Sequence, residues 1–250
     1  MVKINPSYLL FKTCLYPLLP YLAYEASKVK KSASALPAIS ERLVLKGKKS
    51  ELLLLGESTA AGVGATSTDF TLAGHIFNLF KGEFTVSNFG KKGIRIAETL
   101  PFFEAELAEI SKSKEGIFIF LGANDCFQLT NPKSFAKSFA GLIDRLEQLF
   151  QPNWIYMADI PPVQLFPAFS PLMKSCLHRQ REFLRNEMRL ISANRNNVIF
   201  EKIKLELKEN FFASDGIHPS DLGYQLITEF AFEGIQNHMK QRNPERSGLQ

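Results

Sequence analysis

Four consecutive leucines, Leu52 to Leu55, constrain the fold of this chain more than any other stretch. A short apolar run without polar interruption is typical of a strand buried on both faces, as strands of a parallel sheet are. The run ends at Gly56, and Glu57 and Ser58 follow at once. Ser58 is therefore expected at the carboxyl end of a buried strand, where open α/β sheets place their active sites. It is a candidate nucleophile, or else a cap of the next helix.

Similar apolar runs alternate with helical patterns along the rest of the chain. Besides the leucine run, strands are predicted at 84–88, 116–121, 154–158 and 198–200. Helices are predicted at 69–80, 96–111, 132–150, 177–193 and 221–240. Five buried strands that alternate with helices predict one parallel sheet with helices on both faces.

The composition is that of a globular protein without a metal or a disulfide framework. Of the 250 residues, 45% are hydrophobic and 22% are charged, which is ordinary for a domain with a sizeable core. The net charge of +5 permits attraction to anionic surfaces, but the scattered lysines and arginines argue against nucleic acid. The three cysteines are widely spaced and odd in number, so reduced thiols are expected: Cys14, Cys126 and Cys176. No cluster with metal-ligand spacing occurs.

The N-terminal segment, residues 1–31, is mostly apolar and aromatic. Charged residues and prolines interrupt it before a membrane-spanning length is reached: Lys12, Pro17, Pro20 and Glu25. Lysines at 28, 30 and 31 follow, as they would beside lipid headgroups. Three interpretations stay open: a helix packed on the domain, an anchor at a membrane interface, or a cleaved secretion signal. The expected location is accordingly cytoplasmic or membrane-associated, with secretion less favoured.

Four polar stretches carry the residue types that acyl transfer needs: 56–58, 88–93, 122–125 and 215–219. Ser58 offers a hydroxyl nucleophile, His218 a base for its proton, and Asp215 a carboxylate to orient the imidazole. Candidate donors to an oxyanion are the backbone N–H groups of Ser58 and Gly93 and the side-chain amide of Asn124.

These stretches resemble the sequence blocks of the SGNH hydrolases, or GDSL-like lipases and esterases. The blocks occur in family order as LGESTAAGVGA, SNFGKKG, LGANDCF and SDGIHPSDLGY, and they match at Ser58, Gly93, Asn124, Asp215 and His218. The resemblance implies a three-layer α/β/α sandwich with a five-stranded parallel, flavodoxin-like sheet. It also implies a serine esterase that needs no cofactor. One departure is Glu57, where the family usually has aspartate.

The resemblance leaves the substrate open. A carboxylesterase or lipase acting on small or lipid esters is expected; a carbohydrate O-deacetylase or an acyltransferase would use the same triad, and a non-catalytic membrane scaffold is a remote alternative. The loop 159–172 supplies Phe166 and Phe169 as candidates for the substrate pocket, unless they pack against the last helix. Basic residues near Gly93 form either a cationic rim or a solvated loop: Lys91, Lys92 and Arg95.

The chain is divided into four parts on these grounds. They are the apolar segment at 1–31, a linker at 32–50, the hydrolase domain at 51–240 and a disordered tail at 241–250. The expected partners are an ester substrate and, through residues 7–31, a membrane surface. No oligomeric state is predicted.

Overall fold

The computed structural model describes residues 6–33, 35–110, 112–204 and 210–242. A six-stranded sheet forms its centre, in the order β1-β3-β2-β4-β5-β6. The strands are β1 (Val44–Leu45), β2 (Glu51–Gly56), β3 (Thr85–Gly90), β4 (Gly116–Phe120), β5 (Trp154–Met157) and β6 (Val198–Ile199). Strands β2 to β6 are parallel to one another, and their order is that of flavodoxin-like sheets.

The predicted five-stranded sheet is wrong by one strand. The five parallel strands are confirmed, but β1 adds an antiparallel edge strand beside β3. It lies inside the segment assigned to a linker. Only two residues pair, and Val44 is 54% exposed. Such a short, half-solvated strand leaves no apolar run or alternation in the sequence, so pattern reasoning could not find it.

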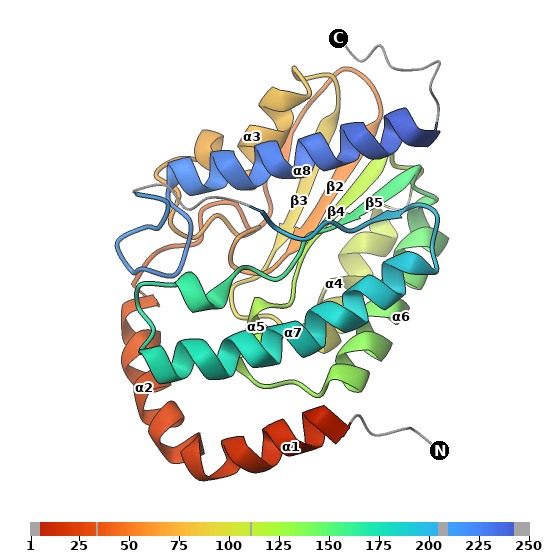
Figure 1. Cartoon of the computed structure of the whole chain (residues 1–250). Helices are drawn as coiled ribbons and strands as arrows, with labels where there is room; N and C mark the ends of the chain where they lie inside the picture. Colours follow the sequence, from red (N-terminus) through yellow and green to blue (C-terminus); the bar gives the residue numbers. More distant parts are fainter. Residues whose placement is uncertain (1–5, 34, 111, 205–209, 243–250) are drawn as a thin grey trace.

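Helices cover both faces of the sheet (Figure 1). They are α3 (Leu72–Leu79), α4 (Ile96–Glu109), α5 (Ala123–Phe127), α6 (Pro132–Phe150), α7 (Pro171–Ala193) and α8 (Asp221–Arg242). Short 3₁₀ turns are η2 (Thr68–Phe70) and η3 (Val163–Leu165). Helices α3 and α8 lie on one face, and α4, α6 and α7 lie on the other, which confirms the three-layer prediction.

The leucine run of β2 serves both faces at once. Leu53 and Leu55 join the core beneath α4, α6 and α7, while Leu52 and Leu54 join the core beneath α3 and α8. All four are at most 1% exposed. Each buried leucine stabilises the fold by about 1.5–3 kcal/mol relative to solvent exposure, so this strand anchors the whole sheet.

Helix α7 begins six residues earlier than the predicted position 177. The side chain of Ser170 accepts a hydrogen bond from the backbone N–H of Met173, and Pro171 occupies the first turn. Serine at the N-cap followed by proline is a strong start signal. The earlier start moves the beginning of α7 next to the loop that carries Phe166 and Phe169.

Two further helices precede the sheet, joined by the 3₁₀ turn η1 (Tyr16–Leu18): α1 (Pro6–Leu15) and α2 (Leu19–Ala33). The ring of Tyr8 meets the ring of Phe183 on α7 edge-on, with 5.1 Å between centroids. Tyr8 and Leu15 are buried, while several apolar side chains remain exposed: Leu9, Leu10, Tyr16, Tyr21 and Tyr24.

Within the described ranges, the helices are all too short or too polar to cross a bilayer. Most of the predicted tail at 241–250 lies outside the described residues.

Candidate active site

Ser58 lies in the turn that leaves the carboxyl end of β2. Hydrogen bonds fold the turn back on itself: the Ala61 N–H donates to the Glu57 carbonyl at 2.9 Å, and the Val63 N–H donates to the Ser58 carbonyl at 3.1 Å. The Glu57 N–H also donates to the carbonyl of Phe120 at the end of β4, at 3.0 Å. These bonds fix the backbone on both sides of Ser58 and bring it to the sheet edge expected from the sequence.

Asn88 supports this turn from the neighbouring strand β3. Its side-chain amide donates to the Ala60 carbonyl at 2.8 Å and also to the Ser40 carbonyl. Asn88 is 1% exposed, so both bonds are shielded from water. The sequence places Asn88 in a polar stretch but assigns it no role. The signal that could have indicated this role is the position of a polar residue near the end of a buried strand.

A second loop holds Asp215 and His218 as a compact pair. The Nδ1 of His218 lies 2.5 Å from Oδ2 of Asp215. The other carboxylate oxygen accepts from the backbone N–H groups of Ile217 and His218, both at 3.0 Å. Burial disfavours the charged form of Asp215, but these three hydrogen bonds outweigh it and lower the pKa of its carboxyl below the ordinary value. Asp215 is therefore a fixed anion behind the imidazole.

Several contacts join the Ser58 turn to this loop. The hydroxyl of Tyr224 on α8 donates to the Val63 carbonyl at 2.7 Å. The carboxylate of Asp221 accepts from the backbone N–H and the hydroxyl of Thr66, at 2.8 and 2.6 Å. Gly64, at φ +97°, passes so close to the second loop that a Cβ there would lie 2.5 Å from the Pro219 carbonyl oxygen. The Ser58 turn is thus hydrogen-bonded to the start of α8 and packed against the loop that carries His218.

Glu57, the residue that departs from the family pattern, is 4% exposed and faces the start of α5. One carboxylate oxygen accepts from the Ala123 N–H at 2.8 Å, and the other accepts from the Asn124 N–H at 2.9 Å and from the Asn124 side chain at 2.5 Å. Burial is the dominant influence and raises its pKa to about 7, against these hydrogen bonds. Glu57 therefore positions Asn124 directly.

The two remaining oxyanion candidates are Asn124, in the first turn of α5, and Gly93, in the loop after β3. The Asn124 amide also donates to the Ile94 carbonyl at 3.2 Å, and the carboxylate of Asp125 accepts from the Ile96 N–H at 2.8 Å. To donate to an oxyanion, Asn124 would exchange its long bond to Ile94. Gly93 has φ +81°, and no atom lies within 4 Å of where its Cβ would be. Glycine is needed there for the backbone conformation.

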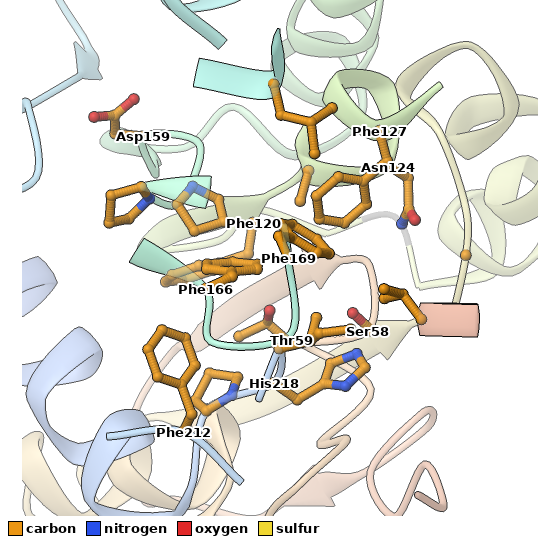
Figure 2. Close-up of a pocket in the computed structure, with 18 of the residues that line it drawn as sticks. Ser58, Thr59, Phe120, Asn124, Phe127, Asp159, Phe166, Phe169, Phe212 and His218 are labelled. Atoms are coloured by element: carbon orange, nitrogen blue, oxygen red, sulfur yellow. The ribbon is translucent and has the colours of Figure 1, made fainter. Parts of the chain in front are cut away.

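One cavity of about 790 Å³ brings the predicted residues together. Ser58, Gly93, Asn124 and His218 line it. Figure 2 shows Ser58, Asn124 and His218 among the residues around this space. Phe166 and Phe169 line it as well, and they are only 5% and 7% exposed. Asp215 is not among the lining residues; it stands behind His218. All the site residues expected from the sequence therefore lie in or against one space.

The basic loop beside Gly93 has local partners. The Lys92 ammonium donates to the Leu36 carbonyl at 3.1 Å, and Lys91 lies over the ring of Phe102, 5.4 Å from its centroid. Arg95 forms an ion pair with Glu98. Of these contacts, only the ion pair with Glu98 neutralises part of the positive charge expected at the rim.

The three cysteines are free thiols. Across the described part of the chain, no group of three or more histidine, cysteine, aspartate or glutamate side chains is arranged to hold a metal ion.

Comparison with known proteins identifies the family. Residues 54–226 match the GDSL-like lipase/acylhydrolase family. The chain belongs to this family. A search of curated proteins found no match. The family assignment makes the protein an ester hydrolase that acts on small-molecule esters.

Solved structures of GDSL-family proteins share its fold at low sequence identity. The psychrotrophic esterase EstA from Pseudoalteromonas sp. is 17% identical, with a TM-score of 0.59 over 76% of this chain and 99% of that one. A lipolytic G-D-S-L protein from Veillonella parvula is 17% identical, with a TM-score of 0.60 over 74% and 97%. The acetylxylan esterase Axe2 from Geobacillus stearothermophilus is 15% identical, with a TM-score of 0.54 over 76% and 95%.

Proposed function

We propose that this GDSL-like acylhydrolase cleaves carboxylic esters through an acyl-enzyme on Ser58. The observation that carries the proposal is the Asp215–His218 pair, in which Nδ1 and Oδ2 are 2.5 Å apart. His218 lines the same cavity as Ser58, and Asp215 stands behind the imidazole. A serine beside a histidine that is oriented by a carboxylate is the arrangement that activates a hydroxyl at neutral pH.

The contact with Asp215 determines which nitrogen of the His218 imidazole acts as the base. Because Nδ1 of His218 is bound to Asp215, Nε2 is the nitrogen that accepts the Ser58 proton. The serine oxygen attacks the ester carbonyl carbon and forms a tetrahedral intermediate. As this collapses, the alkoxide leaves with the proton from Nε2, and the acyl group stays on Ser58. Water then attacks the carbonyl carbon of the acyl-enzyme as it gives a proton to Nε2. The second tetrahedral intermediate collapses, Ser58 leaves with the proton from Nε2, and the free acid is released.

The negative oxygen of each tetrahedral intermediate needs preorganised donors. We assign this role to the backbone N–H groups of Ser58 and Gly93 and to the side-chain amide of Asn124. Glu57 supports the assignment, because it holds both the backbone and the side chain of Asn124. The positive φ of Gly93 supports it as well, since that conformation redirects the local N–H groups.

Hydrolysis of p-nitrophenyl acetate and butyrate by the wild type and by Ser58→Ala tests the proposal. We expect activity that is lost in the variant, and fluorophosphonate labelling of the wild type alone. Full activity in Ser58→Ala would refute the role of Ser58. Labelling of Ser58 without hydrolysis of these esters or of longer p-nitrophenyl esters would favour the other reactions of the same triad, acyl transfer or sugar deacetylation. Product analysis with glycerol or acetylated xylan would separate these two.

A further inference from the structure

The N-terminal helix α2 contributes to the active-site cavity, although it lies outside the residues that match the family. Its lining residues are Leu22, Ala26, Val29 and Lys30. Spacings of four and three residues put the first three on one face of a helix. Leu22 and Val29 are half-buried against the core that contains Phe166 and Phe169. The opposite side of α2 faces solvent, where Tyr24 is 59% exposed.

A cluster of phenyl rings lines the same cavity as α2. Phe127, Phe166, Phe169 and Phe212 come from three segments of the chain and meet with centroid distances of 5.3–6.3 Å. Figure 2 shows these rings gathered on one side of Ser58 and His218. The space that begins at the nucleophile is thus lined by aromatic side chains as well as by the apolar face of α2.

The size and lining of the cavity indicate what it holds. A volume of 790 Å³ is in the upper part of the range of about 300–1,000 Å³ that is usual for small-molecule sites. An acetyl group would leave most of it empty. The ring cluster and α2 offer an acyl chain apolar contacts, and they offer a sugar few hydrogen-bonding groups.

We propose that α2 forms one wall of the acyl-binding part of the active site, and that the enzyme is selective for esters of long acyl chains. The proposal rests on the esterase function above and adds its substrate class. Each methylene that moves from water into this cavity contributes about fourfold to binding. Activity should therefore rise with chain length until the chain fills the space beside α2.

The test adds a phenyl ring on each side of α2. Ala26 and Ser27 are both exposed, but Ala26 lines the cavity and Ser27 does not. Ala26→Phe therefore adds the ring at the cavity, and Ser27→Phe is the matched control. We measure kcat/KM for p-nitrophenyl acetate, butyrate, octanoate and dodecanoate. If the new ring displaces three methylenes, Ala26→Phe lowers kcat/KM for the dodecanoate about 60-fold. It leaves the acetate value within twofold, and Ser27→Phe retains the wild-type profile.

A wild type that prefers acetate, or an Ala26→Phe profile equal to that of Ser27→Phe, would overturn the proposal. An equal loss on acetate and dodecanoate would also count against it, because the substitution would then disturb the catalytic residues or the fold.

Binding of dodecanoate, measured by calorimetry on Ser58→Ala with and without Ala26→Phe, tests the cavity without catalysis. Binding that Ala26→Phe weakens supports the acyl site even if these esters are not hydrolysed, in which case only the proposed reaction fails. If dodecanoate does not bind to Ser58→Ala, which keeps Ala26, the acyl site itself is refuted.

Discussion

The buried carboxyl of Glu57 should make the stability of this protein fall as the pH rises. Glu57 is 4% exposed, and burial raises its pKa from 4.5 to about 7. Between these two pH values the folded protein binds a proton that the unfolded chain has released. Stability that depends on this proton is complete below pH 4.5 and is lost as the pH rises through 7.

The size of the effect follows from the pKa difference. Each pKa unit corresponds to about 1.4 kcal/mol, so a change from 4.5 to about 7 amounts to about 3 kcal/mol over the whole range. Glu57→Gln removes the titration. Its neutral amide places an NH₂ group against donors of Ala123 or Asn124, which adds a destabilisation that does not vary with pH.

Urea unfolding of the wild type and of Glu57→Gln at pH 5, 6, 7 and 8 measures the difference. We expect the free energy of unfolding of the wild type, relative to the variant, to fall by about 2.5 kcal/mol across this series, because part of the total change lies below pH 5. Asp125, also buried with a raised pKa, is present in both proteins, so its own titration largely cancels. Glu109→Gln, at an exposed position near the end of α4, controls for the change of net charge.

A difference that stays constant within about 0.5 kcal/mol would refute the reasoning, since Glu57 would then titrate alike in both states. A difference that increases with pH would show that the three N–H donors outweigh burial. The carboxylate would then be the stable form, as in a site built around an anion.

Two further outcomes follow from the site. Asn124→Ala should lower kcat on p-nitrophenyl butyrate about 10²–10³-fold through loss of an oxyanion donor; an unchanged kcat would assign that role elsewhere. Tyr224→Phe should lower the free energy of unfolding by about 1–3 kcal/mol, because it leaves the buried Val63 carbonyl without its donor; an unchanged midpoint in urea would show that the carbonyl finds another partner.

Much of the fold could be predicted from the sequence because its central strands are apolar throughout. Leu52 to Leu55 are buried on both faces, and such a run has few alternatives. The five-residue helix α5 was missed, since one turn and a half carries no periodicity. The early start of α7 was missed although Ser170 and Pro171 signal it, because the preceding prolines suggested a longer loop.

The residues proposed for catalysis could be predicted because each follows a strand or lies in a short polar block. Parallel topology then brings Ser58, Asn124 and His218 to one edge. The contribution of α2 could not be predicted. An apolar helix face indicates that another part of the protein covers it. Nothing in residues 22–29 indicates that this face lines the cavity of Ser58, about thirty residues later in the sequence. Contact of the N-terminal segment with a membrane surface stays a prediction.

Both edges of the central sheet are short, and this protects its most apolar strand. Edge strands β1 and β6 pair over only two residues each. They present few free backbone groups to another chain, which limits edge-to-edge association. The leucine run of β2 lies between β3 and β4, well inside the sheet. Aggregation through that segment therefore requires unfolding first, so the yield of soluble variants should follow their thermodynamic stability and not their surface charge.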